Sequence, residues 1–264
     1  MSASSSRVAI LLLAAVAVTS GLALALVRPP TPARLSGYRG PMVLLGRWAH
    51  FVSRPVLAGA VALGISANGM TGLGAALAFL AAGAAAIGPG AWGWAGVLLL
   101  LGSWCDLLDG ELARTTGTQS PAGAFLDSNV DRLSEIALFA GLAAALPERS
   151  GVLWAVAALA ASLMVSYARA RGEGLGVACP TFGLERPHRL ILLMSALLVS
   201  AFLAPEAALA LVEGTCGLVA VGAGGTALAR MVVIHHLLRR SEASGQEAPA
   251  QAQDAPGAPT AGAR

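Results

Sequence analysis

The chain has 264 residues, of which 56% are hydrophobic and only 12% charged, and its mean hydropathy is +0.72. Soluble domains carry about 25% charged residues, so the composition excludes a large soluble catalytic domain and indicates an integral membrane protein. All 17 basic residues are arginine. The absence of lysine excludes Schiff-base chemistry and a P-loop, and the scattered arginines do not form the basic stripe typical of nucleic-acid binding.

The first apolar run, residues 8–27, has two interpretations. The Ala-Leu-Ala sequence at 23–25 is typical of a signal-peptide cleavage site, whereas the length of the run equally suits a transmembrane helix. The distribution of arginine described below favours the second interpretation. We therefore expect residues 1–28 to form a hydrophobic helix that is not cleaved.

Residues 29–68 form a basic juxtamembrane region. Within it, 42–57 mixes leucine, valine and aromatic residues with Arg47, His50 and Arg54. A helix of this composition places its apolar face in the membrane interface and its polar face in water. We expect an amphipathic helix that lies on the membrane surface.

We expect residues 69–240 to form a six-helix membrane domain, because a hydrocarbon layer about 30 Å thick needs roughly 20 residues per crossing. Trp92, Trp94 and Trp154 lie where an aromatic belt is expected. The Pro-, Ala- and Gln-rich residues 241–264 are predicted to be disordered. The six apolar spans are 69–88, 91–112, 124–147, 151–170, 189–204 and 207–238.

Arginine-rich and arginine-poor connections alternate along the chain. The connections at 88–92 and 205–213 contain no arginine, whereas the connection at 169–189 contains four. Because arginine-rich connections stay in the cytoplasm, we expect both ends of the six-helix domain and residues 106–132 to face the cytoplasm. The predicted location is the cell (inner) membrane, as a multi-pass protein with its N-terminus outside.

Four of the five aspartates fall within 26 consecutive positions. Asp106 and Asp109 are three residues apart and therefore share one helix face, and Asp127 and Asp131 are four apart and share another. A short Gly- and Pro-containing link allows the two helices to run antiparallel. We expect the four carboxylates to converge at the cytoplasmic end of the bundle, where acidic groups among apolar helices usually mark function.

Four converging carboxylates repel one another, and a hard cation is the simplest compensation. Oxygen-only ligands suit Mg²⁺ or Mn²⁺, and a pair of ions is typical of sites that clamp phosphoryl groups. Arg114 is placed to bind phosphate through two parallel hydrogen bonds. These residues indicate metal-assisted phosphoryl chemistry at a membrane surface.

The same stretch resembles the signature of the CDP-alcohol phosphatidyltransferase family, D-G-x2-A-R-x8-G-x3-D-x3-D with a further Asp three residues upstream. The resemblance extends over roughly 42–240 and implies an all-α polytopic membrane protein with a surface helix before six transmembrane helices. The signature positions here are Asp106, Asp109, Gly110, Ala113, Arg114, Gly123, Asp127 and Asp131.

The resemblance implies a transferase that replaces the CMP of CDP-diacylglycerol with a polar alcohol, works with Mg²⁺ or Mn²⁺, and forms a homodimer. Asp106, Asp109 and Asp127 would bind the metal, and Asp131 would deprotonate the alcohol and contact a second ion. The implied CDP-lipid contacts are Gly110, Ala113, Arg114, Ser120 and Gly123, together with Asn68 and Thr71, which match a Pro-Asn-x-x-Thr element that here lacks its proline.

The connection between the fourth and fifth spans bears on the acceptor alcohol. It resembles the phosphatidylinositol-phosphate synthase branch, with Tyr-x-Arg-Ala-Arg-x-Glu from Tyr167 and Glu-Arg-Pro-x-Arg from Glu185. Its four guanidinium groups suit an acceptor that carries a phosphate, although they also fit the positive-inside rule alone. We expect inositol 1-phosphate, with glycerol 3-phosphate or another polar alcohol as the alternative. The acceptor-binding candidates are Arg169, Arg171, Arg186 and Arg189.

Two other classes of membrane protein stay open on the residues alone. An ion-coupled transporter would distribute its acids among several helices near the middle of the membrane, whereas these acids crowd one end. A prenyltransferase with aspartate-rich motifs would need a second cluster, but the remaining aspartate, Asp254, lies in the tail. A scaffold without activity is disfavoured by the complete motif.

Overall fold

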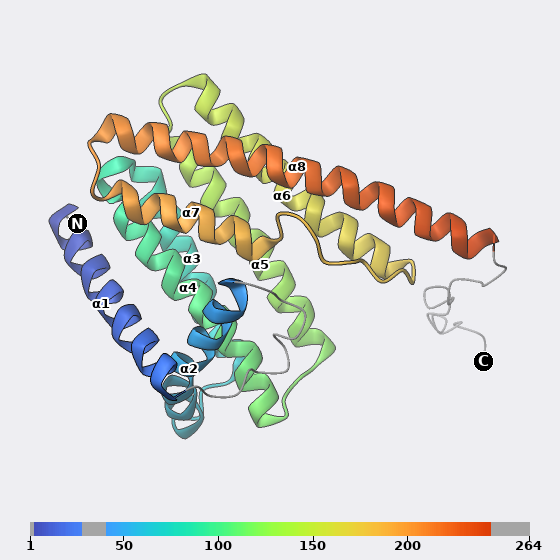
Figure 1. Cartoon of the computed structure of the whole chain (residues 1–264), viewed down its shortest axis with the longest axis horizontal. Helices are drawn as coiled ribbons and strands as arrows, with labels where there is room; N and C mark the ends of the chain where they lie inside the picture. The colour runs from blue at the N-terminus through green and yellow to red at the C-terminus, as the bar shows by residue number, and fades with distance from the viewer. Residues whose placement is uncertain (1–2, 28–40, 244–264) are drawn as a thin grey trace, which may run out of the picture.

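The computed structural model describes residues 3–27 and 41–243, and every secondary-structure element within these ranges is a helix (Figure 1). The expected all-α fold is therefore confirmed. The predicted basic residues at 28–40 and most of the predicted tail lie outside the described residues. The helices are α1 (Ala3–Val27), α2 (Pro41–Ala62), α3 (Ala67–Ile87), α4 (Pro89–Thr116), α5 (Pro121–Ala145), α6 (Arg149–Gly174), α7 (Arg186–Ser200) and α8 (Pro205–Ala243).

Local chemistry explains where α3 begins and ends. The hydroxyl of Ser66 accepts a hydrogen bond from the backbone N–H of Gly69 at 3.1 Å, which satisfies one of the free donors at the start of α3. Gly88 ends α3 with a φ of 103°, a conformation that favours glycine. Pro89 then begins α4, where a missing N–H has no consequence.

Small residues bring α3 into close contact with both of its neighbours. A Cβ atom at Gly102 of α4 would lie 3.1 Å from the carbonyl oxygen of Gly74, and a Cβ atom at Gly141 of α5 would overlap the carbonyl oxygen of Ala82. Such close approach of backbones is how helices in membranes gain packing energy. Helices α3, α4 and α5 therefore form one tightly packed unit.

The centre of the bundle is filled by apolar side chains from α3 to α8. Trp92 is fully buried there and donates its indole N–H to the carbonyl oxygen of Ala85 at 2.9 Å. The expected place of Trp92 in an aromatic belt is therefore wrong: a bonded indole N–H allows the ring to pack inside. Trp154, by contrast, is 42% exposed.

Helices α1 and α2 lie on one flank of the bundle (Figure 1). The start of α1 packs against the start of α4, since a Cβ atom at Gly93 would lie 2.8 Å from the hydroxyl of Ser6. Helix α2 is attached to α4 by a hydrogen bond from the indole N–H of Trp104 to the Ser53 hydroxyl, at 2.8 Å. This arrangement leaves the opposite flank to α6 and α8, which run side by side.

Five of the described helices are long and apolar enough to cross a membrane: α1, α3, α4, α6 and α8. The protein is thus a multi-pass membrane protein. Helix α7 has 15 residues, and α5 bears acids and an arginine in its first half. The expectation of six crossings by the core domain, and the predicted domain boundaries, stay predictions.

The close contact of α5 with α3 leads to a test of the packing. Gly141→Ala should lower the free energy of unfolding by about 1–3 kcal/mol, as overpacking in cores does. Gly83→Ala is the matched control, because a Cβ atom there meets nothing within 4 Å and alanine favours the helix. Thermal unfolding in detergent measures the stability of both variants. Equal melting temperatures for the two variants would show that α3 and α5 are not in close contact.

Candidate active site

The turn between α4 and α5 reverses the chain beside the acidic residues. Gly117 ends α4 in the left-handed region with a φ of 67°. Ser120 then accepts a hydrogen bond from the backbone N–H of Gly123 at 3.0 Å, and Pro121 occupies the first position of α5. The two acid-bearing helices therefore meet at one end of the bundle, as the spacing predicts.

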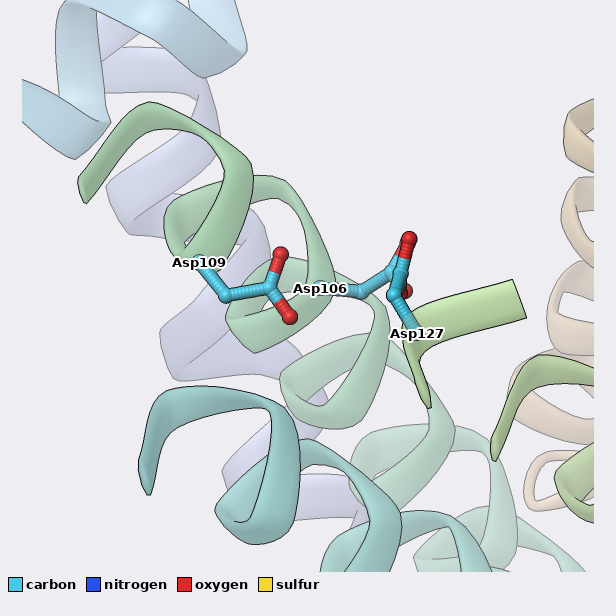
Figure 2. Close-up of side chains that lie close together, drawn as sticks. All are labelled: Asp106, Asp109 and Asp127. Atoms are coloured by element: carbon cyan, nitrogen blue, oxygen red, sulfur yellow. The ribbon is translucent and has the colours of Figure 1, made fainter. Parts of the chain in front are cut away.

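Three carboxylates lie together at this end. Asp106 and Asp109 of α4 and Asp127 of α5 each offer an oxygen, and these oxygens all lie within 4.8 Å of one another. Figure 2 shows the three side chains directed toward a common space. Because like charges this close are unfavourable without a cation, the cluster has the form of a metal site.

The hydrogen bonds of the cluster also fit a bound cation. The hydroxyl of Thr71 donates to Oδ2 of Asp109 at 2.6 Å, which holds that buried carboxylate in place. Oδ1 of Asp127 is buried and has no hydrogen-bond partner. A buried polar atom without a partner is unfavourable, and a hard divalent ion would satisfy it through the oxygen ligands that such ions prefer.

Asp131, the fourth acid, is paired with an arginine from a distant part of the chain. Nη2 of Arg186, at the start of α7, lies 2.6 Å from Oδ1 of Asp131, and its Nη1 lies 3.5 Å from Oδ2 of Asp106. Both partners are largely buried, with 15% of the Asp131 side chain and 27% of the Arg186 side chain exposed. Arg186 therefore links the acidic cluster to the connection before α7.

The other three acceptor candidates do not contact the acids. Arg169 is exposed and bonds Glu173 one turn along α6 at 2.8 Å, and Arg171 is also exposed. Arg189 is completely buried, and its guanidinium bonds both oxygens of Glu135 at 3.0 to 3.4 Å. The structure thus brings Arg186 alone of the four to the cluster and gives Arg189 a partner within the bundle.

The residues predicted to contact the CDP-lipid surround the turn from α4 to α5. The guanidinium of Arg114 lies over Gly110, where a Cβ atom would be 3.4 Å from its Nη1. Asn68, at the start of α3, lies beside Gly123. Ala113 and Ser120 belong to the same end of the bundle. Their roles remain predictions, but their common location is what a single ligand would require.

Sequence reasoning missed a second buried arginine. Arg230 of α8 is 1% exposed, pairs with Glu185 and donates to the carbonyl oxygen of Val165 at 2.9 Å. Its guanidinium also lies 5.5 Å from the ring centre of Phe182. The available signal was an arginine inside the apolar span 207–238, and charged residues in such spans usually mark function. These contacts attach the connection before α7 to α6 and α8.

A groove of about 780 Å³ opens beside the acids and extends away from them between α1, α2, α4 and α7. Its polar end is lined by Asp106, Asp109, Gly110, Arg114, Asp127 and Arg186, and the rest of its wall is almost wholly apolar. A ligand with an anionic head and an apolar tail would match both ends. Together the groove and the acids form a site that suits a lipid with an anionic phosphate head.

Comparison with known proteins identifies the family. Residues 64–233 match the model of the CDP-alcohol phosphatidyltransferase family, more than half of the chain. The chain belongs to the CDP-alcohol phosphatidyltransferase family, and the predicted resemblance is confirmed. Membership argues against the transporter and prenyltransferase alternatives.

Curated relatives include the phosphatidylinositol phosphate synthase of Streptomyces avermitilis, 39% identical over 147 residues, or 53% of this chain and 59% of that one. The archaetidylinositol phosphate synthase of Pyrococcus horikoshii is 42% identical over 108 residues, which are 40% of this chain and 56% of that one. The matches thus span little more than half of these relatives.

Among solved structures, the phosphatidylinositol phosphate synthase of Mycobacterium tuberculosis is similar in fold. Its complex with CDP-DAG has a TM-score of 0.62 and 26% identity, over 69% of this chain and 93% of that one. The complex of the same enzyme with manganese and citrate also has a TM-score of 0.62 and 26% identity, over 69% of this chain and 88% of that one. The likeness therefore covers nearly all of that enzyme and leaves part of this chain unmatched.

The buried pair of Arg189 and Glu135 leads to a prediction about stability. Arg189→Met should destabilise the fold by about 3–5 kcal/mol, because it leaves a buried carboxylate without a partner. Arg189→Met combined with Glu135→Leu should recover most of that loss. Thermal unfolding in detergent reads both effects without a substrate. If Arg189→Met unfolds like the unmodified protein, the pair has no structural role.

Proposed function

We propose that this protein transfers the phosphatidyl group of CDP-diacylglycerol to a polar alcohol, most suitably inositol 1-phosphate, and releases CMP. The observation that carries the proposal is the position of three clustered carboxylates at the polar end of an apolar groove. Family membership and the names of the relatives support the same reaction. The fit of the groove to an anionic head with an apolar tail supports the donor.

On the donor side, Asp106, Asp109 and Asp127 would hold a divalent ion, with Asp131 beside a second. Mg²⁺ and Mn²⁺ both suit such oxygen ligands. The ion would neutralise the diphosphate so that CMP can leave. Arg114 would bind the diphosphate from the exposed end of α4. Gly110 lacks a side chain beside that guanidinium, which leaves the phosphate room to approach the helix backbone.

On the acceptor side, Asp131 would take the proton of the attacking hydroxyl. The hydroxyl oxygen would form a bond to the phosphorus that carries diacylglycerol, and the bond from that phosphorus to the CMP oxygen would break. A carboxylate within hydrogen-bond reach makes a weakly acidic hydroxyl a competent nucleophile. In the described structure Asp131 bonds Arg186, so a phosphate that binds Arg186 would free the carboxylate to act as the base.

Of the acceptor-binding candidates, Arg186 is the direct phosphate contact in this proposal. Arg169 and Arg171, at the exposed end of α6, would attract the acceptor, and Arg189 would position α7 through Glu135. Glycerol 3-phosphate also carries a phosphate, so it is the alternative acceptor. The branch resemblance and the named relatives favour the inositol phosphate.

We also propose that the site faces the cytoplasm and that the protein works as a homodimer in the bilayer. The alternation of arginine-rich and arginine-poor connections supports this orientation, since the acids lie at the same end as the arginine-rich 169–189 connection. Soluble phosphorylated acceptors would then reach the site directly. The homodimer rests on the family resemblance.

Metal dependence is the first test. Asp127→Asn should reduce CMP release at least 100-fold, because removal of a direct ligand disables a metal site. Glu206→Gln, an exposed change at the start of α8, should have no effect. Mn²⁺ binding, followed by electron paramagnetic resonance, should be lost in parallel with activity. Full activity of the unmodified protein in excess EDTA would contradict the proposal.

The acceptor phosphate is the second test. Arg186→Ala should raise the KM for inositol 1-phosphate by about 30-fold or more, since losing one partner of a largely buried charged contact costs about 2–5 kcal/mol. The KM for CDP-diacylglycerol should change little. Arg114→Ala should raise the KM for CDP-diacylglycerol and leave that for inositol 1-phosphate nearly unchanged. Arg149→Ala, a change at an exposed residue, should alter neither KM. Unchanged acceptor kinetics in Arg186→Ala would favour a neutral alcohol.

A further inference from the structure

Helix α1 lies outside the part of the chain that matches the family, which begins at residue 64. It nevertheless lines the groove that leads from the acids, with Ile10, Leu13, Ala14, Val16 and Ala17. The helix therefore adds to the site a wall that the family signature does not describe.

Polar contacts hold α1 to the bundle near both ends. Near its start, Nε of Arg7 donates to the carbonyl oxygen of Ala201 at 2.6 Å, and Ser6 is 1% exposed. Near its other end, the indole N–H of Trp48 in α2 donates to the Ser20 hydroxyl at 2.8 Å. Between these attachments α1 stands away from α4 and α7, and the groove occupies the space.

The two faces of α1 differ in what they meet. Ile10, Leu13 and Ala17 recur at helical spacing and point toward the groove. Leu12, on the other face, is 64% exposed. Opposite α1, the wall of the groove is formed by Leu100, Leu101, Trp104 and Leu107 of α4 and by Leu190, Ile191, Met194 and Leu198 of α7.

We infer that α1 closes the side of the groove and confines an acyl chain of the CDP-linked donor, so that α1 helps to determine which chains are accepted. This inference rests on the proposed function. Its support is continuity: the apolar groove ends at Asp106, Asp109 and Asp127, beside Arg114. A diphosphate at that end would place its lipid chains beside Leu13 and Ala17.

The test fills the groove from the side of α1. Leu13→Trp should raise the KM for dioleoyl CDP-diacylglycerol about tenfold, equivalent to 1.4 kcal/mol, and should affect dihexanoyl CDP-diacylglycerol less because its chains are too short to reach the wall. Ala17→Trp should act in the same way. Leu12→Trp is the matched control, with the same change on the exposed face, and should leave both constants unchanged.

A second variant and a binding measurement make the outcome independent of folding and turnover. Leu13→Ala widens the groove and should reduce the difference between the KM values for long-chain and short-chain donors. In nanodiscs, a trace of CDP-diacylglycerol with brominated chains should quench the fluorescence that Leu13→Trp adds to that of the five native tryptophans more than the fluorescence that Leu12→Trp adds. Brominated phosphatidylcholine should instead quench Leu12→Trp more than Leu13→Trp. Stronger quenching of Leu13→Trp by phosphatidylcholine would mean that bulk lipid fills the groove, and would overturn the inference.

The two proposals fail in different ways. If the unmodified protein releases no CMP from CDP-diacylglycerol with any acceptor, the proposed function is wrong. If it releases CMP but Leu13→Trp behaves like Leu12→Trp in kinetics and in quenching, the function stands and the role of α1 is wrong.

Discussion

Mutual repulsion among the carboxylates at one end of the bundle is the constraint on which the rest of the structure depends. Charges of one sign in a poorly hydrated setting need partners, and the described residues supply them from two other helices. Thr71 of α3 bonds Asp109, and Arg186 of α7 bonds Asp131. The buried oxygen of Asp127 is left for a ligand. The helices around α4 and α5 are thus arranged to serve this cluster.

The place of Arg186 depends in turn on two buried ion pairs that flank it in sequence. Glu185 is paired with Arg230 of α8, and Arg189 is paired with Glu135 of α5. Breaking such pairs is strongly unfavourable, because it leaves a charge without compensation. The start of α7 is therefore fixed to both sides of the bundle, and the guanidinium of Arg186 is held against the acids rather than left to move in a loop.

Spacing within a helix could be predicted from the sequence, and contacts between distant helices could not. The i, i+3 and i, i+4 positions of the acids, with a glycine and a proline between them, were enough to predict the convergence of α4 and α5. Four arginines on one connection looked alike, because positive-inside arginines and paired arginines have the same local pattern. Only the side-chain contacts between α5 and α7 separate Arg189, which bonds Glu135, from Arg186, which bonds Asp131.

Helix α4 carries both ends of the candidate ligand site, and this has a consequence for selectivity. Asp106 and Leu100 lie on one continuous helix, so their axial separation is set by the rise of 1.5 Å per residue, or about 9 Å. Because helices curve only gently, the separation over this short stretch of α4 varies little. In the proposed reaction, α4 would hold the reacting phosphorus at a constant depth relative to the lipid chains, whatever alcohol arrives from the aqueous side.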